Sequence, residues 1–293
     1  MTDATPIDSA WIAANPVPVH SSGTTKNSRG RVLAIGGSRM VPGAIRLTGE
    51  AALRVGAGKL QMATVSSAAV MLGLLVPEAA LIALPEDEHG EIAPEVGKPL
   101  DKALAECDAA VIGPGIGDPD VAKQLLRKVL SEQRDDLVLV VDAMAIGTLP
   151  ELRAEASHFG GRLILTPHFG EMALLTGRDE DDIAADPGTV AQDAAADFGA
   201  VVALKGSSTV VADPDGTLLH YGGGGTGLAT GGSGDVLAGA IGGLISRGAT
   251  PLVAAGWGVW LHGQSGRRVA TTSGPIGFLA RELSGEFPRL LPQ

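Results

Sequence analysis

Residues 222–248 read GGGGTGLATGGSGDVLAGAIGGLISRG, a glycine-rich run that leads into an apolar, helix-like pattern. Glycine permits positive φ angles and lets the backbone approach a ligand closely. The pattern predicts a helix over 233–247, with Ser233 as its N-cap and Gly248 at its C-terminal end. A helix N-terminus carries about half a positive charge and free N–H groups, which together bind anions such as phosphate. The stretch therefore predicts a phosphate-binding loop, with its single carboxylate, Asp235, beside the anion.

Two interpretations of Asp235 are open. The helix dipole alone would stabilise a carboxylate in the first turn. Beside a bound phosphate, the same carboxylate could instead take a proton from an attacking hydroxyl group. Because so dense a glycine cluster is unfavourable unless a ligand requires it, we favour a general base at Asp235.

Short apolar runs alternate with helical patterns along the rest of the chain. Most runs are continuously apolar, which is typical of strands buried on both faces in a parallel sheet. They predict strands at 31–36, 60–64, 80–84, 109–113, 137–142, 162–166 and 200–206, and helices at 43–57, 119–131, 170–176, 188–198, 233–247 and 251–271. After residue 206 the pattern changes to an antiparallel hairpin with a turn at 214–216. The sequence therefore predicts one α/β domain over 1–293, with a mostly parallel central sheet flanked by helices on both faces.

The composition excludes several classes of protein. The net charge of −11 argues against a binder of nucleic acid or of anionic membranes, which needs a basic surface. The single cysteine, Cys107, excludes an intrachain disulfide and is typical of a reduced compartment. The first residues do not resemble a secretory signal, and the apolar stretch 60–84 is interrupted by polar residues and proline. We expect a cytoplasmic protein that acts on small molecules.

Glycine-rich and polar segments follow several predicted strands, where ligands bind in open α/β sheets. These segments are GGSRMVPGA (36–44), GPGIG (113–117), TPHFGE (166–171) and KGSST (205–209). We expect them to converge on one rim with the 222–235 loop.

Individual side chains on this rim have a structural and a functional interpretation. His168 either caps the following helix or donates a hydrogen bond to a substrate carbonyl or phosphate. Lys205 either extends to solvent or pairs with phosphate, and its position on the rim favours phosphate. Glu171 is expected to be a first-turn helix residue, with a water-mediated Mg²⁺ contact as the alternative. GPGIG is as compatible with a plain β-to-α turn as with a backbone contact to ligand.

Other motifs are less informative. Gly222, Gly224 and Gly227 match G-x-G-x-x-G through glycine content alone, and no acidic residue follows about 20 residues later as a dinucleotide fold requires. A Walker A motif is absent. His262 lies in an apolar helical stretch and is expected to belong to the core. The histidines at 20, 89, 158 and 220 share no metal-ligand spacing, so no protein metal site is expected.

Several motifs together resemble one family. GTGLATGGSGDVLAG (225–239) is similar to the G-x-G-D anion-hole signature of ribokinase-like proteins and, more narrowly, to the NAD(P)H-hydrate dehydratases. The resemblance runs from about residue 15 to 285 and includes, in the same order, GRVLAIGGS (30–38), PGA (42–44), VIGPGIG (111–117), LTPHFGEMALLTG (165–177) and VALKGSSTVV (202–211). It implies a ribokinase-like fold and a stand-alone dehydratase, without the epimerase domain that is fused in many relatives.

The resemblance also implies roles for particular residues. Those that would bind the adenine nucleotide are Lys205, Gly206, Ser207, Ser208, Thr209 and Gly234. Those that would face the hydrated nicotinamide substrate are Ala44, Gly115, Gly117, His168 and Asp235. The anion hole would consist of Gly231, Gly232, Ser233 and Gly234. The expected co-substrate is ADP with Mg²⁺, because bacterial-type members use ADP and eukaryotic ones ATP; a homotetramer and cooperation with a separate epimerase are implied as well.

Three positions depart from the family pattern. Gly223 and Gly224 stand where relatives commonly have glycine and asparagine, Phe169 replaces the proline of HPGE, and Met144 lies in a segment that often reads DADAL. None of them changes Asp235. The departures therefore concern the contacts of the loop more than the reaction.

The reaction implied is the repair of hydrated NADH or NADPH in its S-form. Asp235 would help the ring hydroxyl attack the terminal phosphate of ADP, and AMP and phosphate would be released. The same loop and acid would also suit a ribokinase-like kinase of a small alcohol or vitamin precursor. The loop alone would suit a nucleotide-binding regulator without turnover, although a regulator needs no base.

Overall fold

A central sheet of ten strands organises the described part of the chain, residues 4–19, 23–132 and 134–292 of the computed structural model. The strands are β1 (Thr5–Pro6), β2 (Arg31–Ile35), β3 (Lys59–Val65), β4 (Ala79–Leu84), β5 (Ala109–Ile112), β6 (Val138–Val141), β7 (Leu163–Leu165), β8 (Ala200–Leu204), β9 (Thr209–Ala212) and β10 (Leu218–Tyr221). Their order is β1-β10-β9-β8-β7-β6-β5-β2-β3-β4. Only β9 runs antiparallel to its neighbours. The mostly parallel sheet and the hairpin after residue 206 are therefore confirmed.

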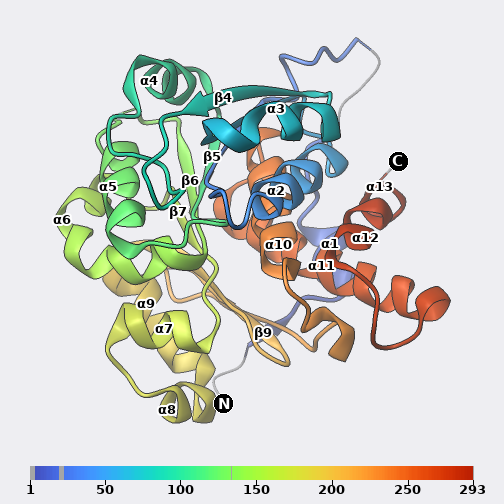
Figure 1. Ribbon diagram of the computed structural model, residues 1–293. Coiled ribbons are helices and arrows are strands. Elements are labelled where there is room, and N and C mark those ends of the chain that lie inside the picture. The colour runs from blue at the N-terminus through green and yellow to red at the C-terminus, as the bar shows by residue number, and fades with distance from the viewer. Residues whose placement is uncertain (1–3, 20–22, 133, 293) are drawn as a thin grey trace.

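Helices cover both faces of this sheet (Figure 1). They are α1 (Ser9–Ala14), α2 (Gly43–Arg54), α3 (Ser66–Leu75), α4 (Gly97–Glu106), α5 (Pro119–Leu130), α6 (Arg153–Ala156), α7 (Phe169–Thr176), α8 (Glu180–Ala185), α9 (Pro187–Phe198), α10 (Ser233–Ser246), α11 (Pro251–Ser273), α12 (Ala280–Leu283) and α13 (Phe287–Leu290), with a long 3₁₀ segment, η1 (Ala143–Leu152). In Figure 1, α4, α5, α6 and α9 lie on one side of the sheet and α2, α10 and α11 on the other. No helix among the described residues is both long and apolar enough to cross a membrane.

All six predicted helices are present, as α2, α5, α7, α9, α10 and α11. The sequence interpretation missed α3 and α4, and also the shorter α1, α6, α8, α12 and α13. In α3 the side chains of Val70 and Leu74 are 75% and 79% exposed, so apolar residues occupy both its buried and its exposed sides and no amphipathic period results. In α4 the buried Leu100, Ala103 and Leu104 do follow helical spacing, and that signal could have been found.

Helix α10 packs against α2 backbone to backbone. Residues 236–246 of α10 are all buried. A Cβ at Gly239 would collide with the backbone of Thr48, and one at Gly243 would lie 2.6 Å from the carbonyl oxygen of Ala52. Glycine at these positions thus permits the close approach. The N-terminus of α10 is thereby fixed over the carboxyl ends of the sheet strands.

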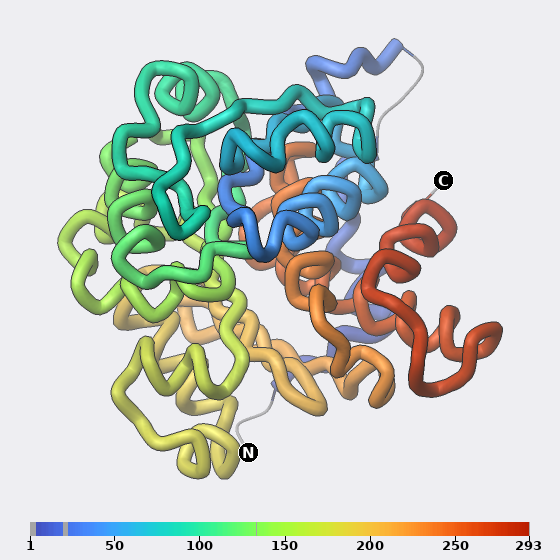
Figure 2. The backbone as a smooth tube through the Cα atoms, in the orientation of Figure 1, coloured from blue at the N-terminus to red at the C-terminus, as the bar shows by residue number. Residues whose placement is uncertain are grey.

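Residues 5–15 contact α11 and the hairpin (Figure 2). Strand β1 adds to the sheet edge by pairing with β10. Behind it, the Trp257 Nε1–H of α11 donates to the carbonyl of Asn15 at 2.6 Å. Strand β10 of the hairpin and helix α11 are thus stabilised by contacts with residues 5–15.

Candidate active site

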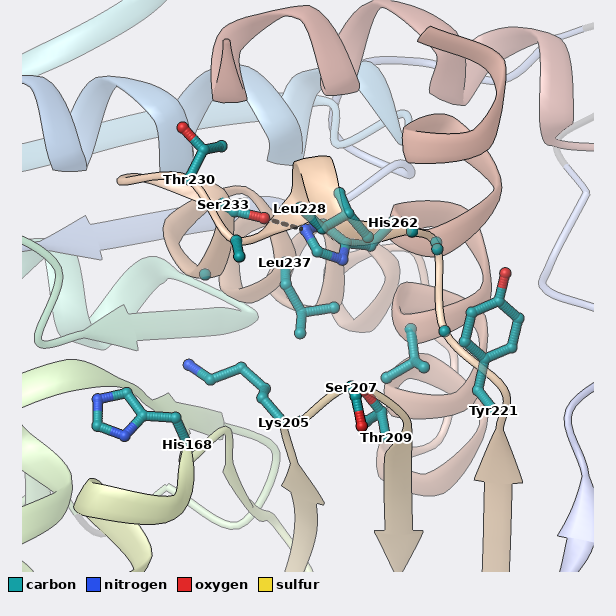
Figure 3. Close-up of a pocket in the computed structure, with 18 of the residues that line it drawn as sticks. His168, Lys205, Ser207, Thr209, Tyr221, Leu228, Thr230, Ser233, Leu237 and His262 are labelled. Atoms are coloured by element: carbon teal, nitrogen blue, oxygen red, sulfur yellow. Dashed lines mark hydrogen bonds between the residues drawn. The ribbon is translucent and has the colours of Figure 1, made fainter. Parts of the chain in front are cut away.

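A cavity of about 860 Å³ lies between the carboxyl ends of β6, β7, β8 and β10 and the N-terminus of α10 (Figure 3). Its walls come from the segments after these strands, from the 222–235 loop and from α11. Segments far apart in sequence meet here because parallel strands end on one edge of the sheet. The cavity is large enough for a nucleotide-sized ligand.

The N-terminus of α10 opens into this cavity with free backbone donors. The N-cap is Gly232, at a φ of 89°, and it has no side-chain cap. The N–H groups of Gly231, Gly232, Gly234 and Asp235 donate to no other described residue. Together with the helix dipole, these donors can bind an oxyanion.

The predicted N-cap, Ser233, is wrong by one residue. Ser233 is the first helical residue, and its Oγ lies 2.8 Å from Nε2 of His262 instead of capping the helix. A left-handed N-cap requires glycine rather than serine, which explains the shift. At the other end, Gly248 lies one residue past the C-cap, Arg247, with a φ of 95°. Its N–H donates to Ile245 at 2.8 Å, as expected for glycine after a helix end.

A buried carboxylate and a lysine lie at the base of the cavity. Lys205 Nζ is 3.0 Å from Oδ1 of Asp142 and 3.7 Å from Oε2 of Glu171. The Asp142 side chain is 2% exposed, and Thr166 donates to its Oδ1 at 2.7 Å. Burial disfavours the Lys205 ammonium, yet Asp142 and Glu171 raise its pKa, so the ammonium stays charged. The Lys205 side chain therefore does not extend to solvent. Asp142 and Glu171 hold its ammonium beside the N-terminus of α10.

Asp235 has the most perturbed carboxyl group of the cavity. Burial, and then the negative charge of Asp142, raise the pKa of Asp235 to about 7, against the lowering effect of Lys205. A base whose pKa lies near the working pH accepts protons efficiently in a transition state. The environment of Asp235 therefore favours a role as proton acceptor over a role that only complements the helix dipole.

His168 and Glu171 form the predicted cap of α7. The Glu171 N–H donates to His168 Nδ1 at 3.2 Å, and the His168 N–H donates to Glu171 Oε2 at 2.8 Å. This reciprocal pair is a capping box. The His168 side chain is nevertheless 60% exposed and lines the cavity. Its structural role is thus confirmed, and its contact with substrate stays a prediction.

The other predicted site residues divide into two neighbouring groups. Lys205, Gly206, Ser207, Thr209, Gly232, Ser233, Gly234 and Asp235 line the cavity, whereas Ser208 and Gly231 do not. Ala44, Gly115 and Gly117 also lie outside its lining, after β2 and β5. A Cβ at Gly115 would lie 3.0 Å from that of Ala44, so these two are adjacent. The Gly117 N–H is 3.2 Å from Glu91 Oε1. The segments 205–209 and 222–235 therefore meet at the cavity with His168, whereas the loops after β2 and β5 lie next to each other outside its lining.

Two residues of the cavity were not recognised from the sequence. Asp142 was noted only as part of a divergent segment, although it anchors Lys205 and perturbs Asp235. His262 was expected in the core, but it lines the cavity and contacts Ser233. Burial lowers the pKa of His262 to about 4, so its ring is neutral near pH 7. Ala143, with a φ of 52°, marks the turn after Asp142 as strained, as is common at functional sites.

The three departures from the family pattern have structural counterparts. A Cβ at Gly224, where relatives have asparagine, would lie 2.6 Å from Cα of Gly263, and one at Gly223, where φ is 85°, would collide with the carbonyl oxygen of Ser207, so glycine suits this loop conformation. A Cβ at Gly206 would lie 3.1 Å from Cζ of Phe169, so this ring covers the start of the 205–209 segment. Met144 is 36% exposed and follows the strained turn. Gly223 and Gly224 line the cavity, whereas Phe169 and Met144 lie outside its lining.

Comparisons with known proteins agree with this geometry. The family model described as NAD(P)H-hydrate dehydratase matches residues 32–289. An ADP-dependent (S)-NAD(P)H-hydrate dehydratase of Xanthomonas campestris is 44% identical over 97% of this chain and 95% of its own length. A bifunctional NAD(P)H-hydrate repair enzyme of Moorella thermoacetica is 38% identical over 97% of this chain, which spans 53% of that enzyme. The chain thus spans about half the length of the bifunctional relatives that it matches.

Solved structures show the same fold. A ribokinase-like superfamily protein from Enterococcus faecalis matches with a TM-score of 0.84 and 27% identity, covering 99% of this chain and 96% of that one. An ADP/ATP-dependent NAD(P)H-hydrate dehydratase from Bacillus subtilis, co-crystallised with ATP and Mg²⁺, matches with a TM-score of 0.82 and 27% identity, covering 99% and 98%. The predicted ribokinase-like fold is confirmed. Because the family model covers most of the chain and a relative is 44% identical along nearly its whole length, the chain belongs to the NAD(P)H-hydrate dehydratase family.

Proposed function

We propose that this protein catalyses the ADP-dependent dehydration of the S-form of hydrated NADH or NADPH, giving NADH or NADPH, AMP and phosphate. The observation that carries the proposal is the position of Asp235, a carboxyl group with a pKa of about 7 at a helix mouth with free N–H donors. The names of the relatives from Xanthomonas campestris and Bacillus subtilis support the choice of substrate and nucleotide.

In the first step Asp235 takes the proton of the ring hydroxyl, and the oxygen of that hydroxyl attacks the terminal phosphorus of ADP. The bond from that phosphorus to the bridging oxygen breaks, and AMP leaves. The free N–H groups of Gly231, Gly232, Gly234 and Asp235, together with the Lys205 ammonium, stabilise the charge on the transferring phosphoryl group. Hydroxide, a poor leaving group, has then become a phosphate ester.

In the second step the carbon–oxygen bond of the ester breaks, pushed by the lone pair of the ring nitrogen. Phosphate leaves, and the ring loses a proton from the neighbouring carbon to restore the dihydronicotinamide. The ring therefore undergoes elimination without any change of oxidation state.

The two groups of residues at the rim suggest how the two substrates lie. We assign the nucleotide to the cavity, with Lys205, Gly206, Ser207, Ser208, Thr209 and Gly234 as its binding residues. We assign the hydrated nicotinamide to the adjoining side, with Ala44, Gly115 and Gly117, from which it would reach His168 in the cavity lining. A Cβ at Gly232 would collide with Leu47 of α2, the helix that carries Ala44, so the two sides adjoin at the anion hole. Asp235 would then lie where both substrates meet.

The residues fit a magnesium ion that arrives with the nucleotide. Carboxylate oxygens suit Mg²⁺, and Asp142, Glu171 and Asp235 supply them around Lys205. Yet the described residues contain no group of three acidic, histidine or cysteine side chains that could hold a metal by itself. Nucleotide phosphates and waters would therefore supply most ligands, with Asp142 and Glu171 as the nearest protein oxygens. When bound, the ion would neutralise phosphate charge.

Further parts of the proposal rest on the relatives. The bifunctional names suggest that this chain works with a separate epimerase that interconverts the two forms of the hydrated cofactor. A cytoplasmic location and a homotetramer are also proposed. Gel filtration with light scattering would test the tetramer directly.

One experiment separates repair from its alternatives. Purified protein is mixed with chemically hydrated NADH, Mg²⁺ and either ADP or ATP, and absorbance of the reduced nicotinamide is followed together with phosphate release. A dehydratase restores NADH and releases phosphate one for one, with ADP better than ATP. A small-alcohol kinase would leave the hydrated cofactor untouched, and a regulator would bind nucleotide without turnover. No recovery of absorbance in protein that binds both nucleotides would contradict the proposal.

The reaction should depend on pH through Asp235. Because its carboxyl must be ionised to accept a proton and its pKa is about 7, kcat/KM should rise about tenfold per pH unit below 7 and level off above it. An ordinary aspartate would be fully ionised throughout this range. Initial rates from pH 5 to 9, in protein shown by circular dichroism to stay folded, check this. A flat profile from pH 5 to 8 would exclude Asp235 as the limiting base.

A further inference from the structure

The six residues HGQSGR (262–267) of α11 lie against the glycine loop. In a helix, residues three or four positions apart lie on the same side, so His262 lies beside Gly266, and Gly263 lies beside Gly266 and Arg267. From the sequence, His262 is expected to belong to the core. The structure instead brings this stretch against both ends of the loop that carries the anion hole.

The loop backbone rests directly on the helix backbone. A Cβ at Gly224 would lie 2.6 Å from Cα of Gly263, and one at Gly266 would lie 3.1 Å from the carbonyl oxygen of Gly224. A Cβ at Gly263 would also collide with the ring of Tyr221, which precedes the loop. Glycine on both surfaces therefore gives a contact without intervening side chains.

Two polar contacts flank this glycine surface. At the start of the loop, the Arg267 guanidinium donates to the carbonyl of Gly223 at 2.8 Å and lies 5.9 Å from the centre of the Tyr221 ring. At the end of the loop, His262 Nε2 lies 2.8 Å from Ser233 Oγ (Figure 3). Among the described residues Arg267 has no ion pair, whereas the adjacent Arg268 pairs with Glu286 at 2.9 Å. Arg267 thus binds the backbone of the glycine loop, whereas Arg268 binds the Glu286 carboxylate.

We infer that His262 and Arg267 are positioning residues that hold the glycine loop in its binding conformation before the nucleotide arrives. A glycine-rich loop loses more conformational entropy on ordering than a loop of the same length built from other residues. Ordering it during binding would therefore weaken the affinity for the nucleotide. The HGQSGR segment orders it in advance, so the free N–H groups of Gly232, Gly234 and Asp235 are already in place at the cavity. The inference rests on the proposed nucleotide site and adds residues that act through the loop.

The first test compares Arg267→Met with Arg268→Met, a control on the same helix that does not contact the loop. We expect Arg267→Met to speed hydrogen exchange in peptides covering 222–235 without nucleotide, and to raise the Kd for ADP in calorimetry about tenfold, the size expected for ordering about one residue. The Km for ADP should rise in parallel, while kcat at saturating ADP changes less than about threefold, because the aligned loop is the same once filled. Arg267→Lys, which keeps a donor, should recover part of the affinity. Arg268→Met should match the wild type.

The second test addresses His262 through Ser233. His262→Leu and Ser233→Ala should each weaken ADP binding, and the double variant should be no weaker than the worse single one, because both remove the same contact. His262→Gln, which can still reach Ser233, should retain more affinity. Additive losses, or an Arg267→Met protein that exchanges and binds like Arg268→Met, would overturn the inference. If the wild type bound no ADP, the proposed function would fail, and the exchange comparison would still decide whether these residues hold the loop.

Discussion

Replacing Asp235 with asparagine is expected to lower the rate of NADH recovery about 10²–10⁴-fold, the usual effect of losing a positioned base. Asparagine keeps the shape of the side chain but cannot take the hydroxyl proton. ADP affinity should change little, because the free N–H groups of the helix mouth remain. Steady-state kinetics with hydrated NADH, and calorimetry with ADP, measure the two effects separately. A loss of less than tenfold would remove Asp235 from the mechanism.

The same variant carries an internal control in its stability. Because the pKa of Asp235 is raised from 3.8 to about 7 in the folded protein, folding binds a proton between these pH values. The wild type should therefore lose stability as pH rises from about 4 to 7, and Asp235→Asn should not. The Tm difference in favour of the variant should grow across that window and stay constant above it. A variant that is inactive but equally destabilised by rising pH would point to an ordinary, solvated Asp235.

Replacing Gly234 with valine is expected to weaken ADP binding and slow the reaction about 10²–10³-fold. A Cβ at Gly234 would lie 3.2 Å from Lys205 Nζ and 4.0 Å from Asp142 Oδ2, so the two further methyl groups would enter the space assigned to phosphate. Losing one aligned donor to a developing charge has an effect of similar size. Calorimetry with ADP and the NADH recovery assay measure binding and rate.

Gly234→Ala provides the graded comparison. Its Cβ meets only the far end of the flexible Lys205 side chain, which can move aside, so the loss should be about tenfold or less. Circular dichroism should report the same fold for both variants. Equal affinity in wild type, alanine and valine proteins would mean that phosphate binds elsewhere than at the mouth of α10.

The fold could be predicted from the sequence because burial leaves a local record. The continuous apolar runs at 31–36 and 109–113 became β2 and β5, whose apolar residues are all buried. The glycine run and the apolar pattern after it likewise gave α10 and its exposed donors. Helix α3 shows the limit of this signal, because its apolar residues surround the helix and give no period.

The site was less predictable because its chemistry depends on distant pairs. Asp142 acts through Lys205, 63 positions later in the chain, and His262 acts on Ser233, 29 positions earlier. No local sequence pattern encodes such pairs. The sequence therefore gives no functional signal at Asp142, which follows a strand, and predicts a core position for His262, which lies among apolar residues. Asp235 was recognised because its partners, the glycines and the helix, are its own neighbours in sequence.

The close packing of α10 on α2 links binding ability to folding. Gly234, Gly239, Gly242 and Gly243 make α10 a poor helix by itself, since each glycine lowers helix stability by about 1 kcal/mol relative to alanine. Helix α10 therefore forms only when α2 and the sheet enclose it. The partial positive charge at its N-terminus forms at the same time. Partly folded chains, and fragments that lack α2, would carry the whole 222–235 loop yet present no anion hole. Nucleotide binding should thus appear in the last cooperative step of folding, and nucleotides present during refolding would select chains that have completed it.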